Sequence, residues 1–164
     1  MIRVVIESPL SGNRERNKLY AYACARDCLR RGESPYASHL FFDHPELLDD
    51  VIPEERELGI KAGFAWGEAA ELRAVYTDLG ISGGMELGIA EAKRLTQRLE
   101  YRTLPEAELK RFEKAQDWSA RLRDQALAIE RAWRGREPNH VLSSMIQRAR
   151  ELADKVKPRG GEGR

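Results

Sequence analysis

Runs of β-branched and apolar residues alternate with helical periodicities from the start of the chain to about residue 104. The strand-like runs lie at residues 2–7, within residues 35–42, which also include the loop after that strand, at residues 72–77 and at residues 99–103. Helical periodicities at residues 13–31, 53–68 and 85–98 separate them. Strands that alternate with helices favour a parallel sheet with helices on both faces. We therefore predict a small Rossmann-like (flavodoxin-like) α/β domain of three layers, with a parallel sheet of about four to five strands.

Polar caps, prolines and glycines mark where these helices begin and end. Asn13 is a typical N-cap for the first helix, and Gly32 follows its last turn. Pro53 stands in the first turn of the second helix, where its missing N–H costs nothing. Gly59 and Gly63 lie one turn apart in that helix. Two glycines on one helix face indicate the close approach of a neighbouring segment.

The chain beyond residue 104 shows two further helical patterns. Residues 103–106 match a capping box that starts a long helix reaching about Arg134, and a last helix begins at Asn139. We therefore expect three parts, namely the α/β domain at residues 1–104, a two-helix C-terminal extension at residues 105–156 and a disordered tail at residues 157–164.

Each helix of the extension carries an apolar stripe. We interpret the stripes as buried core or as the surface of a homodimer or higher homo-oligomer, because exposed tryptophans are costly. The stripe of the long helix consists of Trp118, Leu122, Ile129 and Trp133, and that of the last helix consists of Leu142, Met145, Ile146, Ala149 and Leu152.

Composition narrows the class of protein. Charged residues make up 34% of the chain and no apolar run approaches the roughly 20 residues that span a bilayer, so we expect no membrane partner. The net charge of +1 gives no overall attraction to nucleic acid. Cys24 and Cys28 share one helix face, which is typical of small apolar residues in a core. Reduced thiols and the lack of a signal-peptide pattern predict a cytoplasmic protein.

Three loops that follow predicted strands carry polar residues: Glu7–Gly12, the segment around His39, and Asp78–Met85. Ligands of open α/β sheets bind beyond the carboxyl ends of the strands, so we expect these loops to form the site. In the third loop, glycines permit close approach of a ligand to the backbone, and the helix that follows attracts anions at its N-terminus. We expect a phosphate or ribose hydroxyls to bind there, at Gly80, Ser82, Gly83, Gly84 and Met85.

Glu7 and Asp78 each follow a strand and are predicted to lie on the same rim of the sheet. Paired carboxylates can perform acid–base or nucleophilic chemistry or hold sugar hydroxyls, and the alternative is that both are solvated acids or helix caps. His39 is either a base or ligand contact, or a structural residue. The acidic loop at residues 43–50 matches no metal cage, so we predict no metal ion, and the chemistry needs no cofactor.

Several motifs recur along this domain. The loop Glu7-Ser8-Pro9-Leu10 is followed by Asn17 in the next helix, and a glycine turn precedes a later helix. Further motifs are Ala37-Ser38-His39-Leu40, Ile52-Pro53-Glu54-Glu55-Arg56, Ala62-Gly63-Phe64-Ala65-Trp66, Val75-Tyr76-Thr77-Asp78-Leu79-Gly80-Ile81-Ser82 and Glu100-Tyr101-Arg102. With these motifs, residues 1 to about 104 resemble the nucleoside 2-deoxyribosyltransferase superfamily, in particular an uncharacterised branch of it.

The resemblance implies an enzyme that breaks the N-glycosidic bond of a nucleoside or nucleotide. In that superfamily a glutamate on the helix after the glycine turn attacks the anomeric carbon, the base leaves, and another base or water completes the reaction. Alignment on the first glycine of the family pattern puts Gly88 at the glutamate position, whereas alignment on Glu86-Leu87-Gly88 puts Glu86 there. The resemblance thus implies Glu86 as the candidate nucleophile, with Glu7 and Asp78 as alternatives. We expect ligand contacts from Ser8, Pro9, Leu10, Asn17 and His39.

The sequence is compatible with three functions. The first is a hydrolase or transferase that cleaves or exchanges the N-glycosidic bond of a nucleoside or nucleotide. The second is a non-catalytic module of the same fold that senses or sequesters a nucleotide. The third is an interaction protein whose functional part is the mildly basic C-terminal extension, where residues 103–164 hold 14 Lys and Arg against 10 Asp and Glu.

Overall fold

The computed structural model describes residues 1–44, 46–133, 144, 147–148 and 151. By its internal contacts the chain divides into a first unit, Met1–Phe112, and a second unit that starts at Glu113. The first unit extends beyond residue 104 because Leu104 and Phe112 are both buried in its hydrophobic core. The apolar stripe predicted for the last helix and the predicted tail lie outside the described residues.

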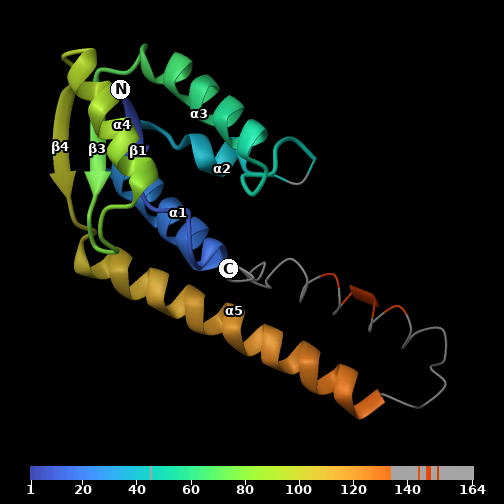
Figure 1. Ribbon diagram of the computed structural model, residues 1–164. Coiled ribbons are helices and arrows are strands. Elements are labelled where there is room, and N and C mark those ends of the chain that lie inside the picture. Colours follow the sequence, from blue (N-terminus) through green and yellow to red (C-terminus); the bar gives the residue numbers. More distant parts are fainter. Residues whose placement is uncertain (45, 134–143, 145–146, 149–150, 152–164) are drawn as a thin grey trace. The chain divides into compact units, whose positions relative to one another are not determined.

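Strands and helices alternate along the first unit (Figure 1). The strands are β1 (Arg3–Glu7), β2 (Ser34–Tyr36), β3 (Leu72–Tyr76) and β4 (Arg98–Arg102). The helices are α1 (Arg14–Arg30), α2 (Ser38–Phe42), α3 (Pro53–Gly67), α4 (Gly83–Arg94) and α5 (Glu106–Trp133), of which α5 continues into the second unit.

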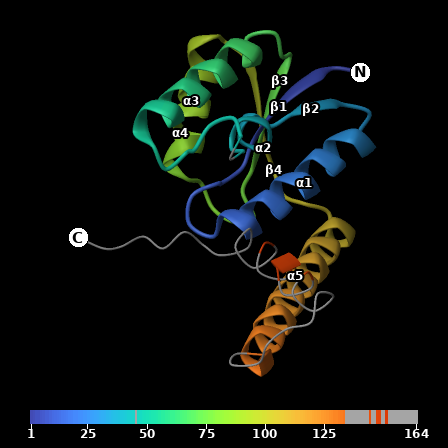
Figure 2. The ribbon, with the colours of Figure 1, turned by 90° about the vertical axis from the view of Figure 1, so that its right-hand side faces the viewer.

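The four strands form one parallel sheet in the order β2-β1-β3-β4. Helix α1 covers one face of the sheet, and α3 and α4 cover the other (Figure 2). This arrangement confirms the predicted Rossmann-like α/β fold with three layers. The chain leaves β1 toward β2 on one side and returns to β3 on the other, so the direction of winding changes between β1 and β3. Such a topological switch point is where open α/β sheets bind their ligands.

Alternation along the strands divides their side chains between the two faces. Val4, Ile6 and Tyr76 belong to the larger core cluster, which they form with apolar residues of α1 and of the first turns of α5. Val75 packs on the other face against Met85 and Ile89 of α4, in a much smaller cluster. The α1 face is therefore a continuous core, whereas the α3–α4 face has room for polar side chains.

Local sequence signals act as predicted. The Asn13 side chain accepts a hydrogen bond from the backbone N–H of Arg16 at 3.1 Å and caps α1, and Gly32 after this helix adopts a φ of 74°. Gly63 of α3 faces Ser38, and a Cβ at position 63 would lie 2.8 Å from the Ser38 Cβ. The predicted close approach of a segment to the glycines of α3 is therefore confirmed, and that segment is α2.

Two element boundaries differ from the sequence prediction. The second strand covers only Ser34–Tyr36, and residues 38–42 form a short helix instead of continuing the strand and its loop. A short apolar run fits either structure, and here contact with α3 decides for the helix. Helix α4 ends at Arg94 rather than near residue 98, because Thr96 adopts a φ of 54° and the Gln97 N–H donates to the Ala92 carbonyl at 2.8 Å.

Cys24 and Cys28 are both free and fully buried in the core cluster of the α1 face, as small apolar residues are. Trp118 and Leu122 of the α5 stripe are exposed, so these two side chains do not lie in the core of the chain. The side chains of Ile129 and Trp133 lie outside the described residues. No helix within the described part of the chain combines the length and the apolar character that a membrane span requires.

Candidate functional site

A cleft opens at the carboxyl ends of β1 and β3, at the topological switch point of the sheet. Its volume of about 110 Å³ is several times the space that one water molecule needs, so it can admit an organic ligand. The lining residues come from the loop after β1, from α2 and the loop after it, from α3, and from the start of α4: Glu7, Ser8, Leu10, Ser11, Ser38, His39, Phe42, Asp43, Leu48, Asp50, Glu55, Arg56, Gly59, Ile60, Ser82, Gly84 and Met85.

Glu7, the last residue of β1, extends its carboxylate under α4. Its Oε1 accepts a hydrogen bond from Nη1 of Arg73 at 2.6 Å, and none of the described residues donates to Oε2. The carboxylate lies against the backbone of Gly88, where the Cβ of any other residue would overlap it. The Glu7 side chain is 14% exposed and lines the cleft, so its free oxygen is accessible to a ligand there.

Burial governs the protonation of Glu7. Removal of the carboxylate from water raises its pKa to about 7, although the neighbouring Arg73 guanidinium acts in the opposite direction. A carboxyl group with a pKa near neutrality exists in both protonation states under physiological conditions. It can therefore serve as a nucleophile when ionised and as an acid when protonated.

His39 of α2 and Ser8 form a second polar pair in the cleft. The Nε2 atom of His39 lies 3.1 Å from the Ser8 hydroxyl, and which of the two donates depends on the tautomer of the imidazole. Burial lowers the pKa of His39 to about 4, against the opposing effect of Asp43. The imidazole is therefore neutral at physiological pH and offers a ligand either a donor or an acceptor, but no charge.

Charged residues of α3 and of the loop after α2 line the cleft, and basic residues of α1 pair with that loop. Lys18 Nζ lies 2.9 Å from Asp43 Oδ2, and Arg14 pairs with the other oxygen of Asp43. Arg56 Nη1 donates to both carboxylate oxygens of Asp50, at 2.8 and 2.7 Å. Asp43 and Asp50 belong to the acidic loop at residues 43–50, and the structure pairs both of them with basic side chains.

The start of α4 forms the wall of the cleft that faces Arg56. Ser82 is the N-cap, and its hydroxyl accepts from the Met85 N–H at 3.4 Å. Gly80 supplies the φ of 81° that turns the chain from β3 into this helix. An Arg56 Nη2 atom lies 3.6 Å from where a Cβ of Gly84 would stand. A guanidinium and the positive end of a helix therefore face the same part of the cleft.

The structure brings together seven of the residues expected at the site. Glu7, Ser8, Leu10, His39, Ser82, Gly84 and Met85 all line the cleft. The others do not line it: Pro9, Asn17, Asp78, Gly80, Gly83 and Glu86. Asn17 instead shapes the loop after β1, since its amide donates to the carbonyls of Leu10 at 3.2 Å and Ser11 at 2.7 Å.

Glu86, the candidate nucleophile from the family pattern, is exposed on α4 and does not reach the cleft. The buried side of α4 is formed by Met85, Gly88 and Ile89. Successive residues of a helix are rotated by about 100°, which turns Glu86 away from the side that Met85 and Gly88 share. The geometry therefore favours Glu7 over Glu86 as the acidic group of the cleft.

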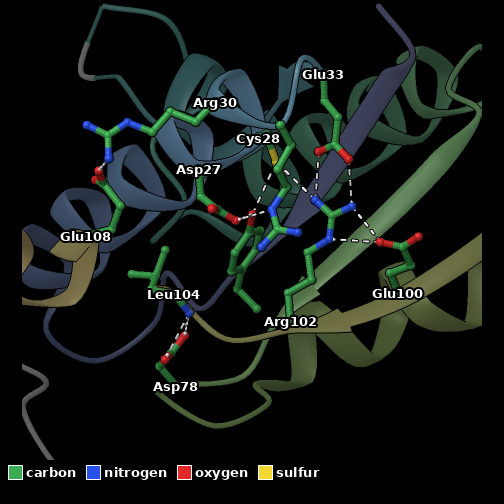
Figure 3. A network of polar contacts seen from close by, with 11 residues as sticks. Asp27, Cys28, Arg30, Glu33, Asp78, Glu100, Arg102, Leu104 and Glu108 are labelled. Carbon is green, nitrogen blue, oxygen red and sulfur yellow. Dashed lines mark hydrogen bonds and ion pairs between the residues drawn. The ribbon is translucent and has the colours of Figure 1, made fainter. Parts of the chain in front are cut away.

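Asp78 is also absent from the cleft, although it follows β3 as predicted. Its carboxylate accepts from the Tyr20 hydroxyl at 2.5 Å. It also accepts from the Leu104 N–H at 3.0 and 3.2 Å (Figure 3). These bonds tie α1 and the start of α5 to the end of β3, on the side of the sheet opposite Glu7. In this structure Asp78 therefore joins α1 to the segment before α5, which is neither a solvated position nor a helix cap.

Two arginines at or behind the cleft, Arg56 and Arg73, were not among the site residues predicted from the sequence. Arg73 lies at the centre of β3 and is 1% exposed, in a strand whose other members are all apolar. A buried arginine is rare unless it is paired, so its position in the apolar run Leu72–Tyr76 was the available signal. That signal indicates a buried partner but cannot identify Glu7, which is distant in sequence.

Comparison with known proteins gives one match. A family model described as "Domain of unknown function (DUF7768)" matches residues 2–102, which include every strand of the sheet and every residue that lines the cleft. Neither the curated proteins nor the solved structures include a match to the chain. The matched region covers more than half of the chain, and the chain therefore belongs to the family of domains of unknown function DUF7768.

Proposed function

We propose that this protein cleaves or exchanges the N-glycosidic bond of a nucleoside or nucleotide, and that Glu7 is its nucleophile. The observation that carries the proposal is the position of the Glu7 carboxylate against Gly88. Of the two alignments with the nucleoside 2-deoxyribosyltransferase pattern, the one on its first glycine puts the family's glutamate at position 88. In this chain that position is glycine, and a carboxylate from β1 occupies the space beside it.

The proposed reaction has two steps. The ionised Glu7 carboxylate attacks the anomeric carbon of the sugar, the bond from that carbon to the base nitrogen breaks, and its electron pair leaves with the base, which takes up a proton. Water or a second base then attacks the same carbon, displaces the carboxylate and loses a proton. Arg73 holds one oxygen of Glu7, so the other oxygen is the attacking atom.

The other groups of the cleft suit the parts of a nucleotide. The neutral Ser8–His39 pair would bind sugar hydroxyls or the edge of the base, because both groups can donate or accept. Arg56 and the start of α4 would favour an anionic substituent such as a phosphate. Phe42 and Leu48 supply apolar surface against which a base would pack.

A second candidate function is a nucleotide-binding module without catalysis. The Glu7–Arg73 ion pair favours it, because a paired carboxylate is a weaker nucleophile than a free one and such pairs also occur in purely structural roles. The same groups of the cleft would then bind the ligand, and Glu7 would only hold a sugar hydroxyl.

Release of free base distinguishes the two functions. We would incubate the protein with ribonucleosides, deoxyribonucleosides, their 5′-monophosphates and NAD, and detect the base by chromatography. Glu7→Gln is expected to abolish release, whereas Glu86→Gln, the same change at an exposed glutamate, is expected to retain it. Release lost in Glu86→Gln and retained in Glu7→Gln would overturn the assignment of the nucleophile. No release from any compound, together with thermal stabilisation by one of them, would establish the binding module.

A further inference from the structure

Behind Glu7 lies a chain of polar contacts that runs away from the cleft into the α3–α4 side of the sheet. Nη1 of Arg73 donates to Glu7 Oε1, and Nε of Arg73 donates to Gln97 Oε1 at 3.2 Å. The Gln97 amide in turn donates to the carbonyls of Gly67 at 2.9 Å and Ala70 at 2.5 Å. Glu7 is therefore connected through two side chains to the backbone between α3 and β3.

Glycines on both covering helices make room for this chain of contacts. Gly88 of α4 lies against the Glu7 carboxylate, and Gly67 of α3 lies against the Arg73 guanidinium, where a Cβ would come within 2.9 Å of Nη2. Both glycines are buried. The two helices thus approach the sheet closely at the two ends of the Glu7–Arg73 pair.

The pair is not fully satisfied. Arg73 Nη2 is buried and makes no hydrogen bond within the described residues, and Glu7 Oε2 accepts none from them. A buried guanidinium with an unused donor is costly. In a purely structural ion pair, we would expect the arginine to donate one hydrogen bond to each carboxylate oxygen, as in a bidentate arginine–carboxylate pair. Here a single contact fixes one carboxylate oxygen and leaves the other free.

We propose that Arg73 and Gln97 are positioning residues for Glu7: they hold one oxygen of its carboxylate and present the other to the cleft. This inference rests on the proposed function for its catalytic consequence, but the positioning itself can be measured without turnover. Gln97 restrains the guanidinium at Nε, Arg73 transmits that restraint through Nη1, and Glu7 receives it at Oε1. A shift of the carboxylate of about 1 Å is enough to lower the rate of an enzyme by about a hundredfold.

Arg73 also affects the pH at which Glu7 ionises. Its positive charge opposes the effect of burial on the Glu7 pKa. The other charged groups that face the cleft are Asp43, Asp50, Glu55 and Arg56, with His39 neutral, and Glu91 lies on α4 near Arg73. All of these remain in place when only Arg73 or Gln97 is replaced. A change in the titration of Glu7 can therefore be assigned to the positioning pair.

The first measurement is the carboxyl titration of Glu7 by carbon NMR on protein labelled at glutamate, with the Glu7 signal assigned by its loss in Glu7→Gln. The wild-type midpoint is expected near pH 7. Replacement of Arg73 by Gln is expected to move the midpoint to higher pH by about one to three pH units, because an adjacent opposite charge is lost. Arg73→Lys keeps the charge and should move it less. Arg102→Lys, at a buried arginine of the opposite face, is the matched control and should leave it unchanged.

The second measurement is steady-state kinetics on any substrate that releases base. Gln97→Met removes the restraint on Arg73 while both charges stay, and its side chain is only partly buried, so the fold is expected to survive. We expect kcat to fall about tenfold to a hundredfold with KM little changed. Arg102→Lys is expected to keep both constants.

These measurements separate the inference from the proposed function. An unchanged Glu7 midpoint in a folded Arg73→Gln protein would overturn the inference even if base is released. Kinetics of Gln97→Met that match those of Arg102→Lys would overturn it as well. A midpoint that moves as expected in a protein that releases no base would support the positioning and overturn the proposed function instead.

Discussion

Two buried arginines, one on each face of the sheet, meet glutamates in different ways. On the α1 face, Arg102 donates to both oxygens of Glu33 at 2.7 and 2.8 Å and to Glu100 at 2.6 and 3.1 Å (Figure 3). On the α3–α4 face, Arg73 donates to one oxygen of Glu7 and has an unused donor. We call the Arg102–Glu33 contact, in which both carboxylate oxygens are bonded, the closed pair. We call the Glu7–Arg73 contact, in which one carboxylate oxygen is unbonded, the open pair.

The protonation of the glutamates follows this difference. Hydrogen bonds from Arg102 lower the pKa of Glu33 and of Glu100, so both are firmly ionised. Burial raises the pKa of Glu7 to about 7 because one contact from Arg73 does not compensate for the loss of water. The same pair of residue types thus forms a fully bonded contact on one face and leaves one carboxylate oxygen unbonded on the other.

The largest effect on stability is expected when Arg102 is removed from the closed pair. Arg102→Met leaves Glu33 buried without its bidentate partner, which should lower the free energy of unfolding by about 3–5 kcal/mol. Urea unfolding measures this, and activity per folded molecule should be unchanged. Arg98→Met removes an exposed partner of Glu100 and is the control, with an expected change within about 0.5 kcal/mol. Equal losses in the two variants would contradict the view of Arg102 as the centre of a buried network.

For the open pair, we predict that the effect of Glu7→Gln on stability depends on pH. The folded protein binds a proton at Glu7 more tightly than the unfolded chain, so this group stabilises the fold below pH 4.5 and loses that contribution as the pH rises through about 7. The difference in unfolding free energy between wild type and Glu7→Gln should therefore decrease between pH 5 and pH 8, by an amount of the order of 3 kcal/mol. A difference that stays constant over this range would show that Glu7 ionises normally.

His39 lies in the same cleft, and its contribution to stability changes with pH in the opposite direction to that of Glu7. Its pKa is lowered from 6.5 to about 4, so its contribution to stability is complete above pH 6.5 and is lost as the pH falls toward 4. Compared with His39→Gln, the wild type should lose about 1–3 kcal/mol of unfolding free energy between pH 7 and pH 4.5, after allowance for partial exposure to solvent. His44→Gln replaces an exposed histidine and should follow the wild type. An identical loss in both variants would place the pH dependence outside the cleft.

The sequence was sufficient to predict the fold and the location of the cleft, because both depend on local signals. The alternation of strand and helix periods, Asn13 as a cap and the glycine turn before α4 each act over a few residues. The loops after β1 and β3 were expected to meet because the carboxyl ends of parallel strands lie at one edge of a sheet, and both line the cleft. Residues 38–42 were misassigned because their apolar run fits either structure and only contact with α3 decides between them.

The identity of the acid in the cleft could not be predicted in the same way. The family pattern favoured Glu86, which the rotation of α4 turns to solvent, and Asp78 lies on the α1 side of the sheet. The pairing of Glu7 with Arg73 depends on the register of β1 against β3, in which Val5 lies opposite Arg73 and Glu7 lies opposite Val75. That register joins segments far apart in the sequence, and single-sequence periodicity contains no information about it.

The smallest expected effect on stability, and the sharpest test of the open pair, comes from Gly88→Ala. The added Cβ would overlap the Glu7 carboxylate, which is the end of a flexible side chain and can move away. The helix gains about 0.5–1 kcal/mol from alanine, which offsets part of the disturbed contact with Arg73, so the net change in unfolding free energy should stay within about 1 kcal/mol. Base release should nevertheless fall as far as in Glu7→Gln, because the carboxylate is present but displaced. Gly83→Ala, where a Cβ meets nothing within 4 Å, should keep full activity. Full activity in Gly88→Ala would mean that the position of the Glu7 carboxylate against α4 does not matter, and the open pair would then be a structural ion pair like the closed one.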